Sequence, residues 1–186
     1  MYNLDNDIEK ILFSQDVLKK RCKELGEELS EIYKDSCPIV TGVLKGAAVF
    51  FADLVRELKC DLVFDFITVS SYGLKTTSSG VINMRKDFDN DITGKDILIV
   101  EDIVDSGFTL KYLKNLLYER KANSVRTVAL LNKYECHPRE LDTDFYGFKI
   151  ENEFVVGYGL DYAGRYRNLP YVGILKRSVY EKKDEK

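Results

Sequence analysis

Residues 97–109 read ILIVEDIVDSGFT, and this stretch decides which fold the chain can adopt. Its apolar start, Ile97 to Val100, is typical of a strand that is buried on both faces. Leucines at 110, 113, 116 and 117 then recur at the spacing of a helix. Between the two lies a turn, Asp105 to Thr109, with a glycine at its centre. A buried strand, a glycine turn and a helix together form one unit of an open, mostly parallel sheet.

Helical and strand-like runs alternate on both sides of this stretch. Helical spacing of apolar residues predicts helices over 14–34, with Ser14 as N-cap, and over 47–58. Strands are predicted at 38–46, 62–69, 97–100, 125–131, 145–150, 153–159 and 171–175. Residues 73–91 are predicted to form a long loop, either disordered or functional, with room for a short hairpin. The charged tail from Glu181 is predicted to be frayed. This order predicts an α/β fold with a mostly parallel central sheet flanked by helices.

The turn from Asp105 to Thr109 has the composition of a phosphate-binding loop. Gly107 permits a backbone conformation that a Cβ would forbid, and successive N–H groups can surround an anion. Ser106 and Thr109 add hydroxyl donors, and the following helix presents its positive end. Open parallel sheets bind ligands beyond the carboxyl ends of their strands, where this turn lies. The alternative is that Asp105 or Ser106 only caps the helix.

Two carboxylates, Glu101 and Asp102, come just before this turn. Carboxylates accept hydrogen bonds from vicinal sugar hydroxyls and bind Mg²⁺, so a ribose 5-phosphate would use both halves of the stretch. Neighbouring residues of a strand point to opposite faces, and the sequence leaves open which of the two contacts the sugar. One alternative is an acidic, solvated strand end. A haloacid-type phosphatase is another, but it needs an Asp nucleophile in a DxD pattern that VEDIVD does not contain.

Length and charge limit the classes of protein. A chain of 186 residues is long enough for one domain with a core of its own. The net charge of -3 argues against a general nucleic-acid binder, which would carry a basic excess. The acidic N-terminus is unlike a secretory signal. The longest apolar run, residues 46–55, is too short to cross a membrane and contains Asp53. We therefore expect neither a nucleic-acid partner nor a membrane partner.

Cysteine and histidine usage narrows the chemistry further. The four cysteines, Cys22, Cys37, Cys60 and Cys136, lie far apart with no CxxC pair, which predicts free thiols in a reducing cytoplasm. His137 is the single histidine. A zinc site built on histidines and a Ser-His-Asp triad are therefore both disfavoured.

With its strand, acid pair and turn, ILIVEDIVDSGFT resembles the phosphoribosyl diphosphate signature of the type I phosphoribosyltransferases. Four more segments resemble the hypoxanthine-guanine phosphoribosyltransferases in the same order: VLKGAAVFFADL, DFITVSSYG, VALLNKY and EFVVGYGLDYAGRYRNLPYVGIL. The resemblance runs from about residue 10 to about 177. It implies the type I fold with a small hood over the active site. Residues 1–186 would form a single domain, with the core roughly at 36–150 and the hood built from the N-terminal and C-terminal segments.

The resemblance also implies a role for each residue of the donor site. The residues matching Asp105, Ser106, Gly107, Phe108 and Thr109 hold the 5-phosphate, and those matching Glu101 and Asp102 face the ribose hydroxyls and a Mg²⁺ region. Asp105 is the candidate catalytic acid/base. Lys45, Gly46 and Arg167 match the residues that bind pyrophosphate, with a non-proline cis peptide bond before the lysine. Taken alone, Lys45 would be predicted to be a solvated surface lysine.

Purine recognition is implied at three further segments. Lys133 matches the lysine that donates to the purine 6-oxo group, although by itself it would be predicted to lie at the surface. Phe154 matches the aromatic residue that stacks on the base, and Val155 contacts the base edge through its backbone. Asp161 is expected at the purine site and as a ligand of a second Mg²⁺, so the metal ligands would be Glu101, Asp102 and Asp161. Ser71 and Tyr72 match the start of a flexible loop.

The predicted function is purine salvage. The chain would transfer the 5-phosphoribosyl group from phosphoribosyl diphosphate to N9 of hypoxanthine or guanine, with Mg²⁺ as cofactor, giving IMP or GMP and pyrophosphate. A preference for xanthine remains open. A non-catalytic regulator of the same fold that binds nucleotide and RNA is the more distant alternative, and it would need a basic face. The partners implied are small-molecule substrates and a second copy of the chain, as a homodimer or homotetramer in the cytoplasm.

Overall fold

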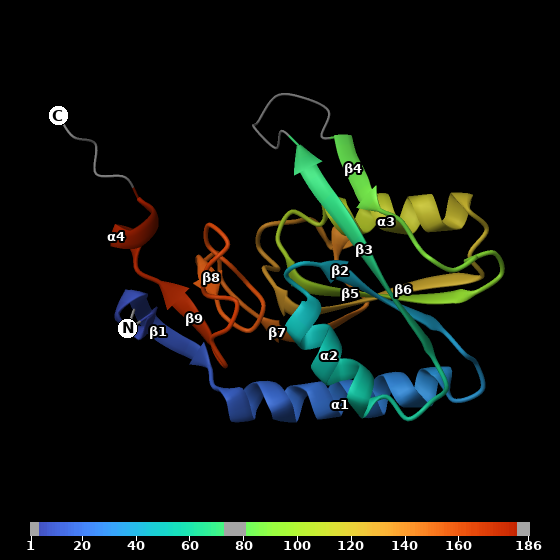
Figure 1. Cartoon of the computed structure of the whole chain (residues 1–186), viewed down its shortest axis with the longest axis horizontal. Coiled ribbons are helices and arrows are strands. Elements are labelled where there is room, and N and C mark those ends of the chain that lie inside the picture. Colours follow the sequence, from blue (N-terminus) through green and yellow to red (C-terminus); the bar gives the residue numbers. More distant parts are fainter. Residues whose placement is uncertain (1–3, 73–80, 182–186) are drawn as a thin grey trace.

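A six-stranded sheet in the order β4-β3-β2-β5-β6-β7 forms the centre of the protein (Figure 1). The structure is a computed structural model that describes residues 4–72 and 81–181. β2, β3, β5, β6 and β7 run parallel, and β4 pairs antiparallel with β3. The strands are β2 (Ile39–Leu44), β3 (Val63–Tyr72), β4 (Val81–Lys86), β5 (Asp96–Val104), β6 (Ser124–Asn132) and β7 (Phe145–Lys149). The predicted α/β fold with a mostly parallel sheet is confirmed.

Helices cover both faces of this sheet. α1 (Gln15–Tyr33) and α2 (Ala48–Glu57) lie on one side and α3 (Phe108–Glu119) on the other (Figure 1). Ser14 caps α1 as predicted, because its side chain accepts a hydrogen bond from the Val17 backbone N–H at 3.5 Å. The helix bounds match the predicted ranges closely because each helix buries a periodic apolar face against the sheet.

β5 is buried on both faces, and its side chains alternate between the two layers. Leu98 and Val100 pack in the core under α1 and α2, whereas Ile97 and Ile99 pack in the core under α3. This alternation has period two, so it continues into the acid pair at the end of the strand. It places Glu101 on the α3 side and Asp102 on the α2 side.

A second, three-stranded antiparallel sheet lies beside the first, in the order β1-β9-β8 (Figure 1). It joins both ends of the chain: β1 follows the short helix η1, and β9 precedes the short helix α4. The elements are η1 (Leu4–Asp7), β1 (Ile8–Phe13), β8 (Val155–Val156), β9 (Val172–Leu175), α4 (Arg177–Tyr180) and, between β6 and β7, η2 (Arg139–Leu141). No helix among the described residues has the length and apolar character needed to cross a membrane.

Three expectations differ from the structure. β1 lies outside every strand predicted from the sequence, because three of its six side chains are exposed, none is fully buried, and they leave little periodicity. The strand predicted at 153–159 is formed only at Val155–Val156, because Gly157, Tyr158 and Gly159 all have positive φ and end it in turns. Residues 81–86, inside the loop predicted at 73–91, form the strand β4, which makes a hairpin with β3 and not within the predicted loop. Residues 73–80 and the tail after Glu181 lie outside the described residues.

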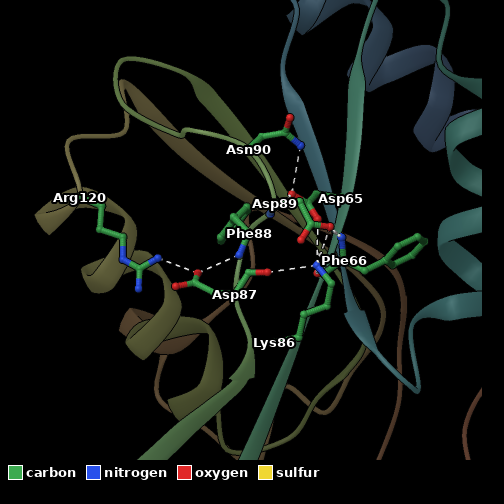
Figure 2. A network of polar contacts seen from close by, with 8 residues as sticks. All are labelled: Asp65, Phe66, Lys86, Asp87, Phe88, Asp89, Asn90 and Arg120. Carbon is green, nitrogen blue, oxygen red and sulfur yellow. Dashed lines mark hydrogen bonds and ion pairs between the residues drawn. The ribbon is translucent and has the colours of Figure 1, made fainter.

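A buried carboxylate holds the base of the β3–β4 hairpin (Figure 2). Asp65 is 4% exposed and accepts hydrogen bonds from the backbone N–H groups of Phe66 and Asp89 and from the side chains of Asn90 and Lys86. Burial alone would raise the pKa of Asp65, but these four donors outweigh it and hold the pKa below its usual value. The network therefore fixes the connection from β4 to β5 against β3.

We expect Asp65→Asn to lower the free energy of unfolding by about 2–4 kcal/mol at pH 7, because an amide would set a donor against these donors. The pKa of Asp65 is depressed in the folded state. The ionised carboxylate therefore contributes to the free energy of unfolding above the unfolded-state pKa, and this contribution is lost as pH falls through the folded-state pKa. Urea unfolding at pH 7 and at about pH 2.5 measures this. Asp89→Asn is the matched control, because its exposed carboxylate pairs with the same Lys86. Equal losses in the two variants would contradict the prediction.

Candidate active site

A cavity of about 400 Å³ opens where β5 ends and α3 begins. Six of the seven residues predicted to bind the phosphoribosyl group line it: Glu101, Asp102, Asp105, Ser106, Gly107 and Thr109. Phe108 does not line it, and its side chain is 53% exposed. Val69 of β3 also lines it, although β2 lies between β3 and β5 in the sheet. The structure therefore brings the acid pair and the turn to one hollow, as the strand-end rule predicts.

The turn has the form of an anion site and not of a capped helix. Gly107 is the N-cap of α3, with φ of +74°, and no side chain caps the helix. The alternative that Asp105 or Ser106 caps α3 is therefore wrong. A Cβ on Gly107 would also lie 2.5 Å from the Leu141 carbonyl oxygen. Both conformation and space thus require glycine, and the first N–H groups of α3 stay free of side-chain caps at the cavity.

A second cavity, of about 230 Å³, adjoins the first and shares Asp102, Ile103 and Asp105 with it. The four residues predicted to contact the purine all line it: Lys133, Phe154, Val155 and Asp161. They come from the end of β6 and from the segment on either side of β8, which are distant in the chain. Only the tertiary structure brings them beside the phosphate turn.

Lys133 is a buried lysine rather than a surface one. It is 9% exposed, and its Nζ lies 3.3 Å from Asn152 Oδ1 and 3.6 Å from Asp105 Oδ2. The preceding residue, Asn132, is buried and hydrogen-bonded to Asp142 and to His137. His137 Nε2 lies 3.0 Å from Asn132 Oδ1 and so has a structural partner. An ammonium held in this way aims its donors at a small cavity.

The acid pair is divided between the two faces of β5. Glu101 is 7% exposed and lines only the larger cavity, whereas Asp102 lines both cavities. Burial raises the pKa of Glu101 well above its usual value, and the neighbouring Asp102 raises it further. Burial also raises the pKa of Asp102 from 3.8 to about 6, against the hydrogen bond that its carboxylate accepts from the Ile103 N–H at 2.9 Å. Each carboxylate would therefore be stabilised by a cation in the cavity.

In metal-free protein we expect Asp102→Asn to raise the free energy of unfolding above pH 6 and not at pH 4. An acid whose folded-state pKa is raised costs stability as pH rises from its unfolded value to its folded value. The difference between 3.8 and about 6 is worth at most about 3 kcal/mol. Thermal unfolding in EDTA at pH 4 and pH 7.5 measures it, with Asp91→Asn in an exposed turn as the control. An Asp102→Asn protein less stable than wild type at pH 7.5 would contradict this.

The residues predicted for pyrophosphate lie at the α2 side of Asp102. The peptide bond between Leu44 and Lys45 is cis, as the resemblance implies, and Lys45 is exposed. A Cβ on Gly46 would lie 1.6 Å from Asp102 Oδ2, so the absence of a side chain there makes room for that carboxylate. Arg167 is not part of either cavity lining; its guanidinium donates to the Gly159 carbonyl oxygen.

The three residues predicted to bind Mg²⁺ differ in how well their surroundings suit a metal ion. Hard carboxylate oxygens suit Mg²⁺, which binds through one or two carboxylates together with substrate phosphates, and buried Glu101 and Asp102 fit that role. Asp161 fits less simply, because Oδ1 pairs with Arg167 at 2.6 Å and Oδ2 accepts from the Gly164 N–H at 2.8 Å. Within residues 4–72 and 81–181, no group of three or more His, Cys, Asp and Glu side chains is arranged to hold a metal ion.

Several lining or contacting residues were not predicted, and Ile103 and Asn152 are two of them. Ile103 lines both cavities, and the alternation along VEDIVD could have drawn attention to it. Asn152, which accepts from Lys133, carries no sequence signal, since it lies in an irregular segment after β7. The backbone of Ser71 and Tyr72 ends β3, and their side chains lie outside the described residues. Their prediction as a flexible loop is thus not tested.

A parallel sheet whose strand ends hold a phosphate turn, a buried acid pair and an adjoining cavity with a buried lysine defines an α/β protein for phosphorylated sugars or nucleotides. The family model of the phosphoribosyl transferase domain matches residues 10–163. The chain therefore belongs to the phosphoribosyltransferase family, in its hypoxanthine-guanine phosphoribosyltransferase branch.

Three relatives illustrate the similarity. The hypoxanthine-guanine phosphoribosyltransferase of Bacillus subtilis is 52% identical over 96% of this chain and 99% of its own. The enzyme of that name from Lactococcus lactis is 52% identical over 97% of this chain and 98% of its own. The crystal structure of a hypoxanthine phosphoribosyltransferase from Staphylococcus aureus superposes with a TM-score of 0.92 at 42% identity, over 96% of this chain and 97% of that one.

Proposed function

We propose that this chain is a purine-salvage enzyme that transfers the 5-phosphoribosyl group from phosphoribosyl diphosphate to N9 of hypoxanthine or guanine. The observation that supports this most is the pair of adjoining cavities, one with a phosphate turn and one with a buried lysine, that share Asp102, Ile103 and Asp105. A phosphorylated ribose in the first would present its C1′ to a base in the second. The names of the relatives agree with this reaction.

The donor is held by residues of different character at its two ends. The amides and hydroxyls from Asp105 to Thr109 bind the 5-phosphate, and Lys45, Gly46 and Arg167 bind the diphosphate. Glu101 and Asp102 accept hydrogen bonds from the ribose hydroxyls. These two carboxylates and Asp161 would hold Mg²⁺, which would supply positive charge to offset that of the diphosphate and make it a better leaving group.

The base is oriented by Lys133, Phe154 and Val155. Lys133 donates to O6, Phe154 stacks on the ring and Val155 contacts the base edge through its backbone. N9 forms the bond to C1′ while the bond from C1′ to the diphosphate oxygen breaks. Asp105, at the junction of the two cavities, accepts the proton that the purine loses at N7. The product is a nucleoside 5′-monophosphate with release of pyrophosphate.

Pyrophosphate release from phosphoribosyl diphosphate and Mg²⁺ with each purine in turn tests this. We expect release with hypoxanthine and guanine and not with adenine, whose 6-amino group would set a donor against Lys133. Faster release with xanthine would move the assignment to a xanthine-preferring enzyme. No release with any purine, together with an RNA gel shift, would favour the non-catalytic regulator.

We further propose a single domain in which the six-stranded sheet is the core and the β1-β9-β8 sheet is the hood. That small sheet is built from both ends of the chain, which supports the division. We also propose that the chain forms a homodimer or homotetramer. Light scattering during size-exclusion chromatography would measure the molar mass and so the number of copies. The free thiols of all four cysteines suit the reducing cytoplasm where we place the enzyme.

A further inference from the structure

Phe154 belongs to a cluster of three aromatic rings at the edge of the smaller cavity. Tyr180 stacks on Phe154 with ring centroids 4.7 Å apart and planes 20° apart. Tyr162 meets Phe154 edge-on at 5.6 Å and Tyr180 edge-on at 6.4 Å. Phe154 lines the cavity, but Tyr162 and Tyr180 do not. Tyr180 therefore covers one side of the Phe154 ring and leaves the cavity side for a ligand.

Tyr180 is held in place by the second sheet and not by the cavity. The backbone N–H of Leu175, in β9, donates to the Phe154 carbonyl oxygen at 2.9 Å, which ties the strand before α4 to Phe154. The next residue, Lys176, donates its N–H to the Asp7 carbonyl oxygen and its Nζ to the Asn6 carbonyl oxygen. The N-terminal segment thus anchors the start of α4, and α4 places Tyr180 against Phe154.

We infer that Tyr180 is a positioning residue for the purine: it supports Phe154 from behind, so that base, Phe154 and Tyr180 form a stack of three planar rings. The inference rests on the proposed function and extends it to a helix beyond the segment that matches the family model, which ends at residue 163. Stacked aromatic rings attract each other beyond the area that they bury, and a ring held from behind loses little freedom when a base stacks on its front.

The same arrangement links both ends of the chain to base binding. Phe154 is 37% exposed in the absence of a base, which is high for a phenylalanine beside a folded sheet. Without Tyr180, Phe154 would sample more rotamers and the base would have to order it. The cavity assigned to the 5-phosphate and ribose is lined by residues of β3, β5, the turn and α3, and by no residue of α4. The effect of Tyr180 is therefore specific to the base.

The test uses the full chain, with pyrophosphate release measured against hypoxanthine and against phosphoribosyl diphosphate. We expect Tyr180→Ala to raise the KM for hypoxanthine about 3–10-fold, in line with the strength of an aromatic pair, and to leave the KM for phosphoribosyl diphosphate within about twofold. Tyr180→Phe keeps the ring and should match wild type. Tyr171→Ala is the matched control, because Tyr171 packs in the same hydrophobic cluster but its ring is hydrogen-bonded to Asp5.

A double-mutant cycle separates support of Phe154 from general loosening. Phe154→Leu should raise the KM for hypoxanthine by itself, and Tyr180→Ala should add little in that background. Three results would each overturn the inference. The first is a KM for hypoxanthine that is unchanged or lower in Tyr180→Ala, and the second is full additivity of Tyr180→Ala with Phe154→Leu. The third is an equal rise of the KM values for hypoxanthine and phosphoribosyl diphosphate that Tyr171→Ala also shows. If wild type releases no pyrophosphate with any purine, the proposed function fails; equilibrium dialysis of hypoxanthine against wild type and Tyr180→Ala still decides the role of Tyr180.

Discussion

Asp105→Asn is expected to lower kcat about 10²–10⁴-fold while phosphoribosyl diphosphate binds nearly as well as to wild type. Asp105 is the first residue of the phosphate turn, yet its side chain is 63% exposed and lies where the two cavities meet. In the proposed site the amides and hydroxyls of the turn bind the phosphate, and the substitution preserves them. Asparagine keeps the size and one acceptor of the carboxylate but cannot take a proton.

Steady-state kinetics at saturating Mg²⁺ and calorimetric binding of the donor measure the two effects separately. Ser106→Ala is the matched control, because it removes a donor to the phosphate and should weaken donor binding more than turnover. Turnover of Asp105→Asn close to wild type would remove Asp105 from the acid/base role.

Lys133→Ala should reduce the preference for hypoxanthine over adenine, as a ratio of kcat/KM values, by about 10²-fold or more. The Lys133 ammonium has three donors and no acceptor, and in the structure two of its near neighbours are oxygens of Asn152 and Asp105. A purine with a 6-oxo group can accept from it, whereas the 6-amino group of adenine cannot. Because Lys133 is buried, water replaces a missing partner poorly.

Donor binding should change little in Lys133→Ala, since Lys133 does not line the phosphate cavity. Kinetics with hypoxanthine and adenine, and calorimetry with phosphoribosyl diphosphate, provide the comparison. Lys149→Ala is the matched control, a lysine at the end of the neighbouring strand β7 that is exposed and lies over the rings of Tyr134 and Tyr146. A collapse of donor binding in Lys133→Ala would show that the lysine serves the donor and not the base.

Much of the fold could be predicted because its signals are local. β5 contains a continuous apolar run, because it is buried on both faces, and α3 has the apolar period of 3.6, because it buries one face against the sheet. β1 and β8 could not be found in the same way, because no side chain of β1 is fully buried and β8 has two residues. Their pairing depends on β9, which is distant in the sequence from β1.

The candidate site likewise has a part that local sequence predicts and a part that depends on contacts between distant segments. The sequence by itself determined the phosphate turn and the acid pair, because a glycine turn between a buried strand and a helix is a local motif whose chemistry follows from its residue types. The tertiary structure alone decided that Lys133 is buried beside Asp105, that Glu101 lies on the α3 side of β5 and Asp102 on the α2 side, and that Tyr180 stacks on Phe154. These depend on contacts between segments far apart in the chain, and burial, which sets both pKa and hydrogen-bond strength, exists only once the layers have packed.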